Sequence, residues 1–221
     1  MKIISETENY IVIQKAPGED SEKDVPRLLA DQSGKDASDY FCVHRLDKTA
    51  SGLLVYGKNR SQAADLTKQI QDETVEKSYL AIVAGKPETA EGSFQDLLYK
   101  DKMKQKAFPV KRMRKGVKEA ELSYKVLETI QYEGSLISLV DVKLHTGRFH
   151  QIRCQFASRR MPLLGDGKYG SRIKTKNLCL FCNRLSFYDS AAKSAVSFEA
   201  SPEDETPWNL FDTEAAPWKS D

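Results

Sequence analysis

The run HRLDKTASGL at residues 44–53 decides how this chain is interpreted. It places one carboxylate, Asp47, two residues after Arg45 and directly before a turn of small residues. If the first half is extended, Arg45 and Asp47 share one face, while His44 and Leu46 share the other. A carboxylate beside a guanidinium stays ionised at neutral pH, because the opposite charge favours its anionic form. The run therefore suits a nucleophile or a base, and a surface ion pair at a strand end is the structural alternative.

Three motifs in this order resemble the signatures of the RluA-type RNA pseudouridine synthases. The first is HRLD followed by alanine, serine and glycine, and the second is KSYLAIVAG at residues 77–85. The third covers residues 145–170 and contains TGRFHQIR and PLLGDGKYG. A KAPG turn at residues 15–18 is similar to the family's lysine-proline-alanine-glycine turn with its middle pair exchanged. The resemblance covers residues 4–211, and three ordered motifs are more specific than any one of them.

Length and composition set the first limits on the class of protein. The chain has 221 residues, of which 40% are hydrophobic, enough for one large domain or two small ones. No apolar run approaches the roughly 20 residues that span a bilayer, and the amino terminus lacks the apolar core of a signal peptide. We therefore expect a cytoplasmic protein with no membrane partner. The four cysteines are scattered and do not suggest a disulfide framework.

Charge is strongly segregated although the net charge is only +2. Residues 100–118 contain nine Lys or Arg and one acid, and residues 143–176 again contain nine and one. A solvated face is the structural interpretation of such runs. The functional interpretation is a surface that follows RNA phosphates, with binding that weakens steeply as salt releases counterions. The candidate contacts in the first segment are Lys111, Arg112, Arg114 and Lys115.

Hydrophobic periodicity predicts many strands and few helices, which indicates an α+β protein with a mixed, mostly antiparallel sheet. The resemblance implies the pseudouridine synthase fold, a long bent sheet with flanking helices and a central cleft. Ser61 is the expected cap of the second helix. The expected strands are residues 10–15, 52–57, 79–84, 121–128, 136–144, 178–187 and 195–200, and the expected helices lie near 26–29, 61–71 and 149–159.

The domain organisation is expected to be simple. Residues 1–221 are predicted to form a single catalytic domain that begins directly in catalytic sequence, with no separate amino-terminal RNA-binding domain. The tail from about residue 202 is acidic and offers Trp208, Phe211 and Trp218 as docking side chains.

The resemblance implies three catalytic residues. Asp47 matches the essential aspartate and would act as a nucleophile at the sugar or as a base at the ribose, two routes that the sequence leaves open. Tyr79 matches the active-site tyrosine, which stacks on uracil and can assist removal of the C5 proton. Arg153 matches the arginine that pairs with the aspartate. The structural alternatives are a buried strand tyrosine for Tyr79 and a phosphate contact for Arg153.

Four more residues are expected to touch the RNA. The resemblance implies that Arg45 fills the gap that the flipped nucleotide leaves in the RNA. A planar guanidinium suits this role because it can stack on bases and donate hydrogen bonds at the same time. Ile152 would form an apolar wall of the base pocket, with core packing as the alternative. Arg148 and His150 lie where a helix opens after Thr146, so free amides there could hold a phosphate. His44 is expected to pack rather than to catalyse.

The sequence thus predicts an RNA uridine isomerase that acts on structured RNA, either tRNA or rRNA. No cofactor is expected, because the isomerisation implied by the resemblance involves no net redox change or hydrolysis. No metal is expected either, since the lone Cys179–Cys182 pair lacks further ligands and is better explained by apolar packing. No obligatory protein partner is evident. The alternatives are a non-catalytic RNA-binding protein on the same fold and, with less support, a phosphate-ester hydrolase. The motifs do not encode which RNA or which uridine is the target.

Overall fold

The computed structural model describes residues 1–213, so Trp218 of the acidic tail lies outside the described residues. The chain divides into two compact units. The first unit comprises residues 1–77 and 181–202, and the second begins at Ser78, ends at Leu180 and resumes at Glu203. Within residues 1–213, no helix is long and apolar enough to cross a membrane.

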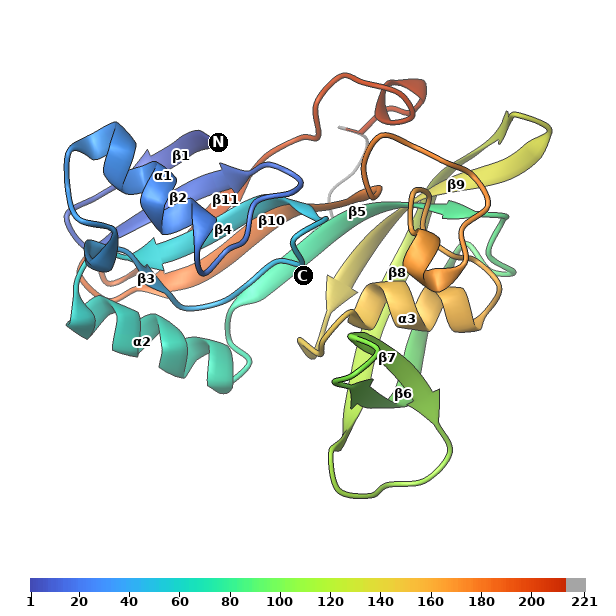
Figure 1. The fold of residues 1–221 in the computed structure, drawn as a ribbon, viewed down its shortest axis with the longest axis horizontal. Helices are drawn as coiled ribbons and strands as arrows, with labels where there is room; N and C mark the ends of the chain where they lie inside the picture. The colour runs from blue at the N-terminus through green and yellow to red at the C-terminus, as the bar shows by residue number, and fades with distance from the viewer. Residues whose placement is uncertain (214–221) are drawn as a thin grey trace. The chain divides into compact units, whose positions relative to one another are not determined.

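The first unit is built on a sheet whose strand order is β1-β2-β4-β10. Strand β11 pairs with β10, and the short β3 pairs with β4 (Figure 1). The neighbours are antiparallel except for β4 and β10, which are parallel. The strands are β1 (Lys2–Glu6), β2 (Tyr10–Lys15), β3 (Phe41–Cys42), β4 (Ser51–Gly57), β10 (Leu180–Asp189) and β11 (Ser194–Glu199).

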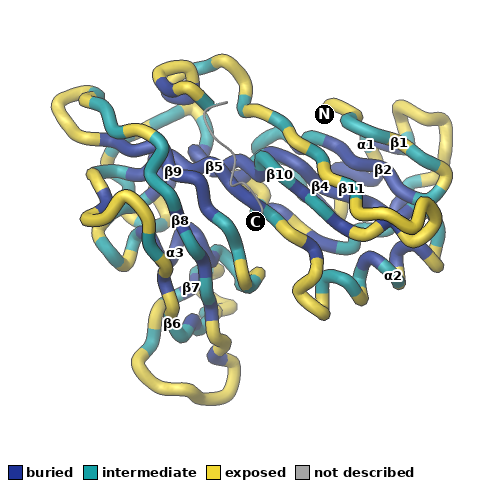
Figure 2. Tube along the Cα trace, turned by 180° about the vertical axis from the view of Figure 1, so that it is seen from behind, coloured by how far each residue is buried: buried dark blue, intermediate teal, exposed yellow. Residues whose placement is uncertain are grey.

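Strands β2 and β4 form the core of the first unit. Strand β4 is an apolar run and β2 begins with four apolar residues, and Figure 2 shows both buried along nearly their whole length. Helix α2 (Arg60–Gln71) packs so closely on β4 that a side chain at Gly57 would collide with the backbone of Ala63. The predicted cap of this helix is wrong. Asn59, not Ser61, caps it, and its side-chain oxygen accepts the N–H of Gln62 at 2.8 Å.

The second unit contains an antiparallel sheet in the order β5-β9-β8-β6-β7. Helix α3 (Gln151–Ser158) packs on the face formed by β6 and β8, where Gln155 donates to the carbonyl oxygens of Phe94 and Ala120 (Figure 1). Phe156 of α3 meets Phe94 edge to face at 5.0 Å between ring centroids. The strands are β5 (Glu76–Ala84), β6 (Glu91–Asp101), β7 (Lys106–Val110), β8 (Val117–Tyr132) and β9 (Ser135–Leu144).

The predicted fold class is confirmed: the protein is α+β with a mixed, mostly antiparallel sheet. Strands β1, β3, β6 and β7 were not predicted. Strand β6 alternates poorly, and β7 is short and contains Pro109, which normally counts against a strand. The basic segment at residues 100–118 therefore includes the end of β6, all of β7 and the start of β8, three antiparallel strands in the order β8-β6-β7, joined by an exposed loop at residues 111–116.

Two helices differ from expectation at their ends. The first helix, α1, extends over Asp24–Ser33 and is longer than the single turn predicted near residues 26–29. Helix α3 begins at Gln151, two residues later than predicted, because His150 before it has a left-handed backbone (φ 52°). The start of the predicted acidic tail packs onto the second unit, where Trp208 and Phe211 are buried and Glu205 pairs with Lys176 at 2.8 Å.

Candidate active site

Asp47 lies in the irregular segment between β3 and β4, and its neighbours alternate as predicted. His44 and Leu46 are buried, with 8% and 7% of their surfaces exposed, whereas Arg45 is exposed and Asp47 is half-buried. Directly after Asp47 the chain turns, and the N–H of Ala50 donates to the Asp47 carbonyl oxygen at 3.0 Å. The acidic side chain therefore projects from a tight turn beside a buried strand.

The backbone is held by hydrogen bonds on both sides of Asp47. Before it, the Ser21 hydroxyl donates to the carbonyl oxygen of Leu46 at 3.2 Å and accepts the Leu46 N–H at 3.3 Å. After it, the N–H of Gly18 donates to the carbonyl oxygen of Lys48 at 2.7 Å. A side chain flanked by two fixed peptide groups has little backbone freedom, as catalytic geometry requires.

Lys15 provides a second contact to the residue after Asp47. Its side chain is fully buried, and its ammonium group donates to the carbonyl oxygens of Ala16, Glu19 and Lys48 at 2.7, 3.1 and 3.3 Å. Burial lowers the pKa of Lys15 to about 8, opposed by the negative charges of Glu19 and Asp47. The KAPG turn, noticed in the sequence only as a resemblance, therefore supports the Asp47 segment.

His44 completes the edge of β4. On that edge β3 pairs with Tyr56 and Gly57, and the His44 Nε2 accepts the N–H of Val55 at 3.2 Å. Burial, aided by the positive charge of Lys77, lowers the pKa of His44 to about 3. The ring is thus a neutral acceptor at physiological pH, which agrees with the packing role predicted for it.

Arg45 forms its ion pair with a residue other than Asp47. Its Nη1 lies 2.9 Å from Oε2 of Glu22, and both side chains are about half exposed. The guanidinium is therefore paired with Glu22, and its expected effect on the Asp47 carboxylate stays a prediction. Exposed ion pairs contribute little to stability, so Arg45 can leave Glu22 at low cost. Its predicted insertion into RNA stays a prediction.

The predicted residues of the second unit are buried. Tyr79 lies on β5 opposite Val142 of β9, with 6% of its surface exposed. Ile152 and Arg153 are consecutive residues of α3, both at least 95% buried. Their predicted meeting with Asp47 joins residues of two different units and stays a prediction.

Arg153 has a carboxylate partner that the sequence analysis missed. Its Nε and Nη2 donate to the two carboxylate oxygens of Asp166 at 2.7 and 2.9 Å, the bidentate geometry that fixes a guanidinium most firmly. The same carboxylate accepts the N–H of Tyr169, and the Tyr169 hydroxyl in turn accepts the N–H of Ala107 at 2.8 Å. Asp166 was visible in the third motif as the acid of GDGKYG.

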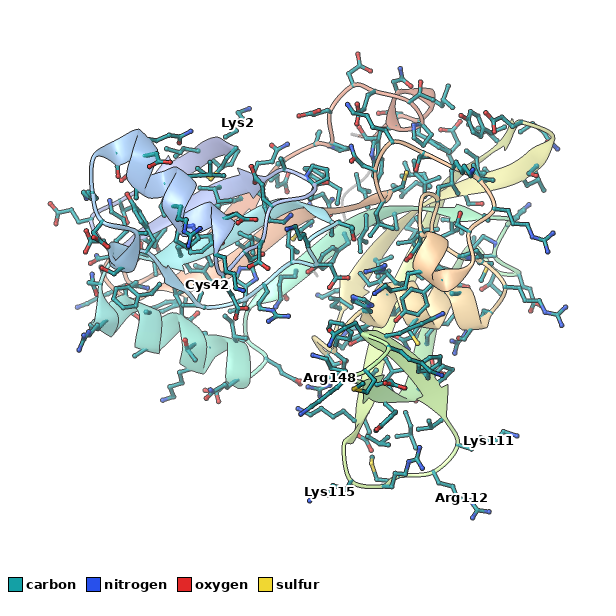
Figure 3. All side chains as sticks on the ribbon, viewed as in Figure 1. Lys2, Cys42, Lys111, Arg112, Lys115 and Arg148 are labelled. Atoms are coloured by element: carbon teal, nitrogen blue, oxygen red, sulfur yellow. The ribbon has the colours of Figure 1, made fainter. Side chains whose placement is uncertain are left out.

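The predicted RNA contacts in the basic segment lie on one loop. This loop joins β7 to β8, and Figure 3 shows Lys111, Arg112 and Lys115 pointing outward from it. Arg114 rests against the ring of Tyr99, with its guanidinium carbon 5.2 Å from the ring centroid. The location fits phosphate contacts, which stay a prediction.

The opening of α3 is partly satisfied within the protein. The Gln151 side-chain oxygen accepts the N–H of Arg148 at 2.9 Å and the Thr146 hydroxyl at 2.8 Å. Arg148 donates from Nε to the carbonyl oxygen of Glu119, and the His150 ring stacks on Phe149 at 3.8 Å. One of the amides expected to hold a phosphate is therefore already bonded, and the side chains of Arg148 and His150 are the stronger candidates.

The cysteines of the CLFC segment are buried, free thiols. Burial raises the pKa of Cys179 to about 12, so this thiol is a poor nucleophile at neutral pH. Within the described residues, no three His, Cys, Asp or Glu side chains gather in a way that could hold a metal ion.

Comparison with known proteins gives a consistent result. The family described as RNA pseudouridylate synthase matches residues 9–158. An uncharacterized RNA pseudouridine synthase of Aquifex aeolicus is 40% identical over 151 residues, which are 66% of this chain and 46% of that protein. The ribosomal large subunit pseudouridine synthase C of Rickettsia bellii is 31% identical over 206 residues, 90% of this chain and 67% of that protein.

Among solved structures, the human RNA pseudouridylate synthase domain containing 1 protein matches with a TM-score of 0.79. The two chains are 21% identical, and the match covers 93% of this chain and 84% of the human one, which shows a shared fold. The chain spans less than half the length of several matched relatives, including 43% of YhcT of Bacillus subtilis.

Proposed function

Because the chain belongs to the RNA pseudouridylate synthase family, we propose that it isomerises a uridine in structured RNA to pseudouridine. One observation carries the proposal. Asp47, in the HRLD motif, projects from a segment whose backbone is bonded on both sides by Ser21 and Gly18. A non-catalytic RNA-binding protein would have no need of such a positioned carboxylate.

The reaction breaks the bond between C1′ of the ribose and N1 of uracil and forms a bond from C1′ to C5. The C5 proton is lost and N1 regains a proton, so product and substrate have the same composition. Asp47 serves either as nucleophile at C1′ or as base at the ribose, and both routes need its ionised form. The stoichiometry consumes no oxidant, water or nucleotide.

The second unit supplies the groups proposed to act on the base. Tyr79 stacks on uracil and assists deprotonation at C5. Arg153 keeps Asp47 ionised and oriented, and it is itself held by both carboxylate oxygens of Asp166. Ile152 contributes an apolar wall to the base pocket.

RNA affinity is proposed to come mainly from phosphate contacts. The loop between β7 and β8 carries Lys111, Arg112, Arg114 and Lys115, and Arg148 and His150 add cationic or polar groups near α3. Arg45 fills the stack when the target nucleotide leaves it. Ribosomal RNA is the favoured substrate because the Rickettsia relative is named for the large ribosomal subunit, with tRNA as the alternative, and the cytoplasm is the proposed location.

Mapping of pseudouridine across the transcriptome tests this function. RNA from cells with and without the protein is compared site by site, and a third strain carries the Asp47→Asn protein. We expect one or a few sites to lose pseudouridine completely in the second and third strains. An identical map in all three, together with RNA bound to the purified protein, would favour the non-catalytic RNA-binding alternative.

A further inference from the structure

The second unit contains a cavity of about 550 Å³ that includes none of the proposed catalytic residues. It lies where the end of β6 and the start of β8 face residues 147–149, which lead into α3. Its walls come from both basic segments of the sequence, residues 100–118 and 143–176. A cavity of this size falls within the range of ordinary small-molecule sites.

Five cationic side chains line the cavity, and one carboxylate lies among them. The carboxylate, Asp101, is already used, since it accepts the N–H groups of Met103 and Lys104 at 2.9 Å each. Among the described residues, the four lysines of the lining form no ion pair. These four lysines thus bring positive charge to the cavity without an ion-paired acid. The five cations are Lys100, Lys102, Lys115, Lys118 and Arg148.

An aromatic ring forms part of the lining. The Phe149 ring stacks against His150 on one face, at 3.8 Å between centroids. Lys100 lies over the ring, with its ammonium nitrogen 4.1 Å from the centroid. Because Lys100 is an exposed residue with a long side chain, a planar group can replace its ammonium over Phe149 while the charge moves to a nearby anion.

One apolar side chain stands at the rim. Met103 is 95% exposed and is flanked in sequence by Lys102 and Lys104. An exposed methionine between two cations has no role in the core of the protein. It is suited to pack against a nucleotide base whose phosphates the neighbouring lysines contact.

We propose that this cavity binds one unpaired nucleotide of the RNA, distinct from the uridine that is isomerised. Its base lies against Phe149 and Met103, and its flanking phosphates contact Lys115, Lys118 and Arg148. The inference rests on the proposed function and deepens it, because an unpaired nucleotide held here would select RNAs by the distance between that nucleotide and the target.

A single-stranded nucleotide fits these features better than other polyanions. In duplex RNA both faces of each base are stacked and its pairing edge is occupied, so a base cannot enter a cavity without leaving the helix. An acidic peptide would satisfy the lysines but would leave the aromatic face without a partner. Free mononucleotides offer a base and one phosphate, but they lack the flanking phosphates that five cations can contact.

Photo-crosslinking with the full chain tests the location. A single-stranded RNA substrate carries 4-thiouridine at one position at a time, and mass spectrometry identifies the attached residue. We expect attachment at Phe149, Tyr99 or Met103 from one position outside the target uridine. Attachment only at residues that do not line the cavity would overturn the proposal.

Binding measurements test the chemistry. We expect Lys118→Gln to weaken single-stranded RNA binding severalfold, and Phe149→Leu to weaken it about tenfold. Lys118 is exposed, so its variant folds even if Phe149→Leu does not. Lys86→Gln, which removes an equal charge from an exposed residue outside the cavity, is the matched control. Equal affinity of Lys118→Gln and Lys86→Gln would contradict the proposal.

Modified RNAs and competing ligands show which class of ligand occupies the cavity. An RNA with an abasic site at the crosslinked position should bind about tenfold more weakly than the intact RNA. Equal binding of the abasic and intact RNAs would show that the cavity does not hold a base, which contradicts the proposal. Displacement of the RNA by an acidic peptide or by uridine monophosphate alone would identify a different ligand. The proposed isomerisation is scored separately. Pseudouridine formed without cavity crosslinks refutes only this inference, and crosslinks without pseudouridine refute only the activity.

Discussion

The hydroxyl of Ser21 bonds both polar backbone groups of Leu46, donating to its carbonyl oxygen at 3.2 Å and accepting its N–H at 3.3 Å. Ser21 is buried, and its own carbonyl oxygen accepts the hydroxyl of Tyr56 at 2.7 Å. A residue twenty-five positions away in sequence thus fixes the peptide groups just before Asp47. This link, together with the bonds that Gly18 and Lys15 donate to the Lys48 carbonyl oxygen, holds the backbone on both sides of Asp47.

We expect Ser21→Ala to lower kcat for pseudouridine formation more than it changes KM. The variant leaves two buried backbone groups of Leu46 without partners, which should also cost about 1 to 3 kcal/mol in the free energy of unfolding. Initial rates over a range of RNA concentrations measure kcat and KM, and urea unfolding measures the stability. Ser194→Ala, an exposed serine of β11, is the control. A loss of stability with unchanged kcat would show that Ser21 has only a structural role.

Lys15→Met should change how stability depends on alkaline pH. The folded pKa of Lys15 is about 8, below the ordinary 10.5, so between these values the unfolded chain binds more protons than the folded one. The lysine therefore makes stability rise with pH across this window, by up to about 3 kcal/mol. Urea unfolding at pH 7.5 and 10 should show this rise in the native protein relative to the variant. If the stabilities of the native protein and the variant changed in parallel with pH, the lowered pKa of the buried Lys15 ammonium would be contradicted.

His44→Gln should protect the protein against mild acid. The folded pKa of His44 is about 3, below its ordinary 6.5, so the unfolded chain takes up a proton as pH falls through 6.5 and stability is lost down to about 3. Glutamine keeps an acceptor for the Val55 N–H but cannot titrate. The variant should lose less stability than the native protein between pH 7 and 4.5. His145→Gln, at an exposed histidine, should behave like the native protein.

Variants of the Arg153–Asp166 pair distinguish a role of Arg153 in stability from a role in catalysis. Asp166→Asn leaves a buried guanidinium without its anion and should cost about 3 to 5 kcal/mol in the free energy of unfolding. The double variant Arg153→Met with Asp166→Leu removes both charges and should recover much of that stability. If Arg153 acts on Asp47 as proposed, the double variant stays inactive although it is folded. Activity in the folded double variant would make Arg153 a purely structural residue.

Patterns local in sequence predicted the core of the fold well. Strand β2 was predicted at its observed ends from alternation that stops at the Pro17-Gly18 turn, and β4 differs by one residue from the apolar run predicted between two glycines. The alternation of buried and exposed side chains from His44 to Asp47 is also confirmed. These features depend on side-chain spacing along one segment, which the sequence displays directly.

Features that depend on distant partners were missed. Asp166 lies thirteen residues from Arg153, and Ser21 lies in a polar stretch expected to be a loop, so no periodicity marks either as a partner. Arg45 was matched to the nearest carboxylate in sequence, whereas folding brings Glu22 to it. Strands β6 and β7 were not predicted because each is defined by its pairing, β6 with β8 and β7 with β6, rather than by alternation along its own sequence.

The most direct measurement of the central claim compares the native protein with Asp47→Asn on RNA tritiated at C5 of uridine. Tritium release reports loss of the C5 proton, and filter binding in the same samples reports RNA affinity. We expect no release by Asp47→Asn, with an affinity for RNA within about threefold of the native protein because phosphate contacts dominate binding. Asp31→Asn, at an exposed carboxylate, should release tritium normally. Release by Asp47→Asn at the native rate would contradict the assignment of Asp47 as the catalytic group.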